Sequence, residues 1–102
     1  MKIIEQLSDM IEEEISDAER YVKCAMKWKE DNLELSQTFY KLSLEEMDHM
    51  EALHRQVTTI IENYRKKEGE PPADMMAVYN YLHKKQIEHA TEVRMMQAVY
   101  KG

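Results

Sequence analysis

The sequence predicts an all-α protein with three long antiparallel helices, over about residues 2–30, 32–68 and 72–101. The 102 residues include only two glycines and two prolines, too few for the hairpin turns of a β-rich fold. Apolar residues recur at steps of three and four along each segment, which is typical of amphipathic helices. Because the chain is short, we expect a single helical domain spanning residues 1–102.

Two breaks separate the three predicted helices. The stronger one combines Gly69, which suits the position just past a helix end, with Pro71 and Pro72, which block continuation and favour a new helix start. The weaker one precedes residue 32, where Asp31 and Glu34 form a candidate capping box. Both joins are short, so neighbouring helices should run antiparallel.

Composition excludes several classes of function. Twenty acidic residues against fourteen basic ones give a net charge of −6, which argues against a nucleic-acid-binding surface. The single cysteine cannot form an internal disulfide. Charged residues soon interrupt the first apolar residues, so neither a signal peptide nor a membrane span is predicted. We therefore expect a cytoplasmic protein that binds neither nucleic acid nor membrane.

Two polar residues interrupt the apolar stripe of the second segment. The members of the stripe are Leu35, Phe39, Leu42, Leu53, Val57, Ile60 and Tyr64. Continuing the same steps between Leu42 and Leu53 gives Glu46 and His49. A charge buried without a partner costs several kcal/mol, so these side chains need partners. Glu-x-x-His presents a carboxylate and an imidazole on one helical face, a spacing used by metal sites in helical bundles.

Antiparallel packing brings further carboxylates to the level of this pair. Counting outward from the two joins sets Asp17 and Glu14 level with Glu46 and His49, and Glu92 close to the same level. Carboxylates combined with an imidazole suit iron, manganese or zinc. The sequence therefore predicts a metal site formed by these five residues.

The same residues also have a structural interpretation. Glu14 ends a run of three glutamates, which is typical of a solvated face, and Asp17 can pair with Arg20 three residues on. The Glu-x-x-His spacing alone is weak evidence, because a second such pair ends at His54 and is rotated by about 140° from the first, toward the flank of the stripe. His54 is expected at the surface or in an interface. His83 and His89 suit polar packing better than a second metal site.

Part of the chain resembles the ferritin and rubrerythrin group. The stretch from Phe39 to His49 resembles that group's second-helix motif, in which an aromatic residue, a small residue and acids lead into Glu-x-x-His. Glu14, Asp17 and Tyr21 resemble its first-helix pattern Glu-x-x-Ala-x-x-x-Tyr, with Asp17 in place of the alanine. The resemblance implies a four-helix bundle that holds two irons and oxidises them with dioxygen or peroxide.

The chain departs from that pattern because it has three helices and one well-placed Glu-x-x-His. Met95 occupies the position where a second histidine would follow Glu92. The resemblance therefore implies a site completed in a homodimer or higher homo-oligomer, with Glu14 or Asp17 and the Glu-x-x-His pair from each chain. A single-metal site within one chain, using Glu92, is the other option.

The whole chain also resembles small helical proteins of bacteria and their phages, a resemblance that implies no biochemical activity. A second hypothesis is therefore a non-enzymatic helical oligomerisation or interaction module that binds no metal. In that case Glu46 and His49 form a buried polar pair that fixes the register of the helices.

Overall fold

The computed structural model describes residues 1–102 and contains three helices and no strand. The helices are α1 (Lys2–Trp28), α2 (Leu33–Glu68) and α3 (Ala73–Lys101). They lie side by side in a rod of 56 × 20 × 18 Å. The predicted all-α class with three helices is confirmed. None of the helices has an apolar stretch long enough to cross a membrane.

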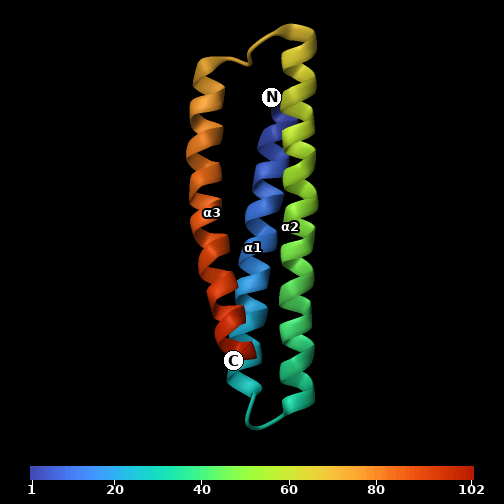
Figure 1. Cartoon of the computed structure of the whole chain (residues 1–102), viewed down its shortest axis with the longest axis vertical. Helices are drawn as coiled ribbons and strands as arrows, with labels where there is room; N and C mark the ends of the chain where they lie inside the picture. Colours follow the sequence, from blue (N-terminus) through green and yellow to red (C-terminus); the bar gives the residue numbers. More distant parts are fainter.

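Helix α1 is the central helix of the three. It packs along α2 and, on another side, along α3, whereas α2 and α3 hardly touch each other (Figure 1). The chain reverses direction at each join, so α2 is antiparallel to both neighbours and α3 runs parallel to α1. A groove lies between α2 and α3, and Ile11 and Ile15 of α1 line its floor.

The two helix breaks lie where the sequence predicts them, with one change of cap. The side-chain oxygen of Asn32 accepts a hydrogen bond from the Leu35 backbone N–H at 3.1 Å, so Asn32 caps α2 in place of the predicted Asp31. At the other end, Gly69 has a φ of +84°, which glycine adopts without strain. Its N–H donates to the Arg65 carbonyl at 3.1 Å, and Pro72 directly precedes α3.

The core face of α2 differs from the predicted apolar stripe. Its buried residues are Ser36, Ser43, Met47, Val57 and Ile61. The predicted leucines, such as Leu42 and Leu53, lie beside that face and are half-buried. The prediction that His49 continues a core stripe is wrong, because its side chain is 59% exposed. Val57 belongs to both the predicted stripe and the buried face, but the buried face also includes two small serines that an apolar pattern does not detect.

Those serines hydrogen-bond to backbone carbonyls of α1. The Ser43 hydroxyl donates to the Ala18 carbonyl at 2.6 Å, and the Ser36 hydroxyl donates to the Ala25 carbonyl at 2.5 Å. Both serines and both alanines are fully buried. Each pair is seven residues from the other on both helices, so the contact repeats every two turns and fixes the antiparallel register.

Helix α3 joins the same polar contacts. Gln97 Nε2 donates to the Ser43 hydroxyl oxygen at 2.8 Å. The Tyr100 hydroxyl lies 2.7 Å from the Ser36 hydroxyl oxygen and is the donor, because the Ser36 proton is directed to Ala25. The polar groups that interrupt the core are thereby satisfied, and they connect all three helices.

We predict that Ser43→Ala lowers the free energy of unfolding by about 1–3 kcal/mol, because it leaves the buried Gln97 amide without an acceptor. Urea denaturation followed by circular dichroism measures the change. Ser16→Ala is the control, because Ser16 is exposed on α1. Equal stability of the two variants would show that the hydrogen bond contributes nothing.

Candidate metal centre

Three of the predicted ligands meet at the contact between α1 and α2. Glu14 of α1 lies beside Glu46 and His49 of α2, and one ligand atom from each lies within 4.8 Å of the other two. His49 Nδ1 is 3.6 Å from Glu14 Oε2 and 3.8 Å from Glu46 Oε2. These distances exceed those of hydrogen bonds, so the three groups surround a shared position without closing on one another.

The Ser–Ala contacts explain why these residues meet. Because Ser43 is opposite Ala18, moving four residues along each antiparallel helix sets Glu14 opposite Met47. Glu46 and His49 are one turn apart on α2 and lie on either side of Met47 along the helix axis. The sequence estimate, which sets Glu14 level with His49, is therefore displaced by two residues.

Burial is uneven across the group. The side chains of Glu14 and Glu46 are 24% and 18% exposed, whereas that of His49 is 59% exposed. Oε2 of Glu14 is buried and has no hydrogen-bond partner. A buried carboxylate oxygen without a donor is costly, and a bound cation or a protonated imidazole would compensate it. The exposed edge at His49 leaves a path from solvent.

The surroundings of the group combine aromatic and aliphatic side chains. About two turns away on each helix, Tyr21 of α1 stacks on Phe39 of α2 with ring centroids 6.2 Å apart. Leu42 and Leu53, four residues to either side of the Glu-x-x-His pair, are half-buried. The carboxylates therefore lie within a partly apolar flank, which lowers the local dielectric and strengthens their interaction with a cation.

The other two predicted ligands lie outside this group. Asp17 is directed to Arg20, with an ion pair of 3.2 Å, and its side chain is 44% exposed. Glu92 is exposed on α3. Helix α3 lies on the opposite flank of α1 from the group, so Glu92 of the same chain does not reach it. The prediction that Asp17 and Glu92 of the same chain are metal ligands therefore does not fit, because neither side chain lies at the position shared by Glu14, Glu46 and His49.

A second titratable cluster attaches α3 to α1. His89 of α3 lies between two carboxylates of α1, with Nδ1 3.0 Å from Glu12 and Nε2 2.8 Å from Glu19. Burial lowers the pKa of His89, but the hydrogen bonds to Glu19 and Glu12 outweigh it and raise the pKa above 6.5. The hydrogen bonds from His89 and Lys23 lower the pKa of Glu19. A protonated His89 thus donates to both glutamates.

The sequence assigns His89 to polar packing without naming its partners. Its partners are seven residues apart on α1, and a spacing of seven places two side chains on one flank of a helix. Glu14 and Tyr21 have the same spacing on the other flank. The seven-residue spacing of Glu12 and Glu19 is therefore a sequence signal for a shared flank of α1. Only helix packing decides which flank of α1 faces α2 and which faces α3.

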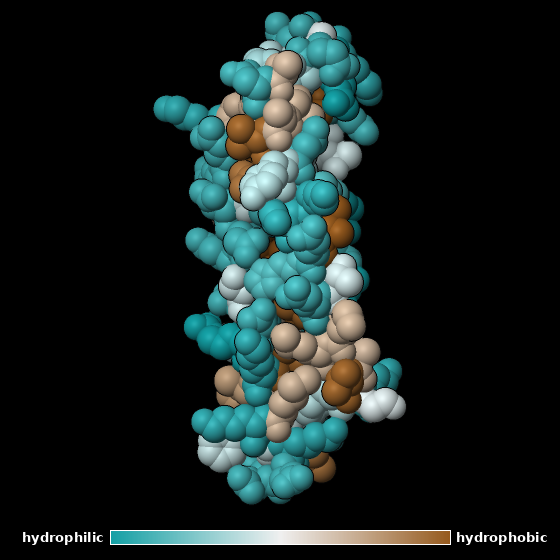
Figure 2. Space-filling view, turned by 90° about the vertical axis from the view of Figure 1, so that its left-hand side faces the viewer, coloured by the Kyte–Doolittle hydropathy of each residue, from teal (hydrophilic) through white to brown (hydrophobic).

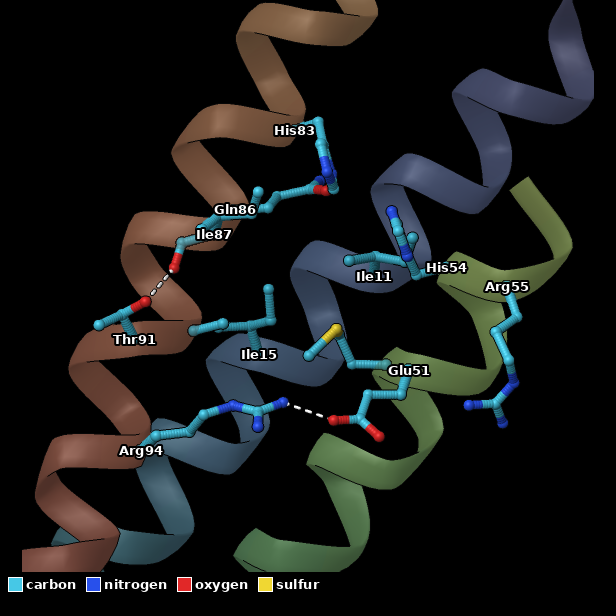
Figure 3. Close-up of a pocket in the computed structure, with 12 residues that line it drawn as sticks. Ile11, Ile15, Glu51, His54, Arg55, His83, Gln86, Ile87, Thr91 and Arg94 are labelled. Carbon is cyan, nitrogen blue, oxygen red and sulfur yellow. Dashed lines mark hydrogen bonds and ion pairs between the residues drawn. The ribbon is translucent and has the colours of Figure 1, made fainter. Parts of the chain in front are cut away.

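The groove between α2 and α3 holds the other two histidines (Figure 3). It encloses about 410 Å³ above the apolar floor of Ile11 and Ile15. His54 of α2 and His83 of α3 stack across it with ring centroids 4.6 Å apart. Burial, and to a smaller extent the neighbouring His54, lower the pKa of His83 below its usual value.

No family model matches the chain, and searches of curated proteins and of solved structures gave no significant match. The resemblance to the ferritin and rubrerythrin group therefore stays a prediction. The functional proposal depends on the chemistry of the side chains that α1 and α2 bring together.

We predict that His89 stabilises the protein in a pH-dependent way. Since its pKa is raised from 6.5 on folding, its contribution is complete below about pH 6 and is lost as the pH rises through the folded-state pKa. The difference in unfolding free energy between the wild type and His89→Gln should therefore shrink as the pH rises from about 6 through the folded-state pKa of His89. A difference that stays constant with pH would contradict this assignment. His83→Gln is the control. Because the pKa of His83 is lowered and not raised, its contribution to the free energy of unfolding should not decrease as the pH rises above 6.5.

Proposed function

We propose that this chain is a metal-binding helical protein that holds iron, or the similar ions manganese or zinc, through Glu14, Glu46 and His49. One observation carries the proposal: a carboxylate oxygen of Glu14 is buried without a partner, next to a second carboxylate and an imidazole. A cation at the shared position would satisfy this oxygen. Two carboxylates and one imidazole form a donor set of the kind that Fe²⁺, Mn²⁺ and Zn²⁺ accept.

The chain's own residues would have distinct roles. Glu14 and Glu46 supply negative charge from two different helices, so binding would strengthen the contact between α1 and α2. His49 would bind in its neutral form, which makes affinity fall at acidic pH. Iron at this position would supply redox chemistry toward dioxygen or peroxide. Tyr21, seven residues from Glu14 on the same flank, would add a hydroxyl to the surroundings.

We predict that the wild-type chain binds about one Fe²⁺ or Zn²⁺ per chain, and that Glu14→Gln and His49→Ala each weaken binding at least tenfold. Anaerobic isothermal titration calorimetry and metal analysis by mass spectrometry measure the affinity and content. Glu13→Gln is the matched control, because it makes the same change one residue away on an exposed position.

Two results would overturn the proposal. One is less than about a tenth of an equivalent of metal after anaerobic loading of the wild type with ferrous iron. The other is equal metal binding by Glu14→Gln and Glu13→Gln, which would place the ion elsewhere. Circular dichroism of each variant shows whether its helices are retained.

We further propose that a second copy completes the centre. Carboxylate-bridged dimetal sites in four-helix bundles use one glutamate from each of two helices and Glu-x-x-His from each of the other two. Helices α1 and α2 supply half of that set in Glu14, Glu46 and His49. The half-buried apolar residues around them form a flank that α3 leaves open. Docking of the same flank of a second chain would bury both half-sites together.

We predict that Met10→Lys weakens metal-dependent dimerisation at least tenfold, because Met10 is one turn from Glu14 on this flank. Met26→Lys is the matched control, because Met26 is also on α1 and equally exposed at 37%, but shares the flank of Glu12 and Glu19. Sedimentation velocity with and without Fe²⁺ measures association. Equal behaviour of both variants would contradict dimerisation through this flank.

A metal-free role is the second candidate. His49 Nδ1 lies within 4 Å of both carboxylates, so a protonated His49 could neutralise the group and fix the helix register without an ion. The chain would then be a non-enzymatic oligomerisation or interaction module. Replacing Glu46 and His49 by leucine should then leave unfolding free energy unchanged or higher, while the wild type takes up no metal.

A further inference from the structure

The outer face of α3 carries a regular stripe that no part of the chain covers. Its seven positions recur at alternating steps of three and four, and all seven are exposed: Val78, Tyr81, Lys85, Glu88, Glu92, Met95 and Val99. The face of α3 toward α1 consists of other residues, among them Ala90 and Val93. The spacing is that of a helix that packs against a second helix along its length.

Hydrophobic residues occupy the two ends of this α3 stripe. Val78 and Tyr81 are each 61% exposed, and at the other end Met95 and Val99 are 64% and 73% exposed. Figure 2 views the molecule from the α3 side and shows hydrophobic patches toward both ends with a largely hydrophilic middle. Exposed apolar patches rimmed by charge are typical of protein interaction sites.

The order of residues in the α3 stripe is complementary to itself in the antiparallel sense. A two-fold axis between positions 88 and 89 sets Val78 opposite the partner's Val99 and Tyr81 beside the partner's Met95. The same axis sets Lys85 opposite the partner's Glu92. Because the two-fold axis repeats every contact, the dimer contains this ion pair twice. Glu88 is next to the axis, and Lys85 of its own chain partly neutralises it at 3.8 Å.

We propose that the α3 stripe is a docking surface for a second copy of this chain, bound antiparallel through α3. Charge complementarity selects the orientation, because a parallel pair would set Lys85 against the partner's Lys85 and Glu92 against the partner's Glu92. The two-fold operation uses the same patch on both copies, as isologous dimers do. A single helix pair buries less than a standard interface of about 1,600 Å², so association is weak and concentration-dependent.

This interface is separate from the flank that carries Glu14, Glu46 and His49. The α3 stripe is on the outside of α3, whereas the proposed metal centre is on the opposite side of α1. The proposal therefore stands independently of metal binding. If both surfaces associate, each chain has two different contacts and the assembly exceeds a dimer.

Charge reversal with rescue tests the α3 interface. Lys85→Glu and Glu92→Lys should each weaken self-association at least about tenfold, because each sets like charges opposite one another twice. The double variant restores opposite charges in an antiparallel pair and should return the dissociation constant to within about threefold of the wild type. In a parallel pair the double variant would not restore it.

Sedimentation velocity at low ionic strength with a chelator present measures these constants, in the wild-type chain and in the Met10→Lys background. Val99→Lys should also weaken association, whereas Ile87→Lys, on the groove side of α3, should not. Two outcomes overturn the proposal: a Met10→Lys chain that is monomeric at several hundred micromolar, and a double variant that stays as weak as its parents. Circular dichroism reports whether each variant keeps its helices.

Discussion

The hydrogen bonds from Ser36 and Ser43 to the carbonyls of Ala25 and Ala18 are the contact on which the other features depend. Small residues on both helices allow the backbones to approach, and the directed hydroxyls allow one register only. A shift by one residue would leave both hydroxyls buried without acceptors, at a cost of about 1–3 kcal/mol each. The register in turn sets Glu14 between the turns that carry Glu46 and His49.

Helix α1 has acidic residues on two flanks, and the structure compensates them differently. On one flank, Glu12 and Glu19 bind the imidazole of His89 and thereby attach α3. On the other flank, Glu14 and Glu46 have only the exposed His49 nearby, at more than 3.5 Å. Part of the net charge of −6 therefore lies at Glu14 and Glu46, where a bound cation would compensate it.

Much of the fold was predictable because its signals are local. The Gly69–Pro72 cluster and the short join before α2 act through backbone conformation, which depends on neighbouring residues alone. The core face of α2 was displaced because serines do not register as apolar. Their burial becomes favourable only when carbonyls of α1 accept their protons, and that partner is far away in the sequence.

Local sequence signals were enough to predict the three helices, their limits to within a few residues, and the shared helical face of Glu46 and His49, because these depend on helical geometry alone. Helix packing is what brings Glu14 to Glu46 and His49 and leaves Asp17 and Glu92 outside the group. The same packing leaves His49 exposed and places His89 between two glutamates. A helix presents several flanks of similar composition, so the neighbour of each flank is set by packing and not by the local sequence.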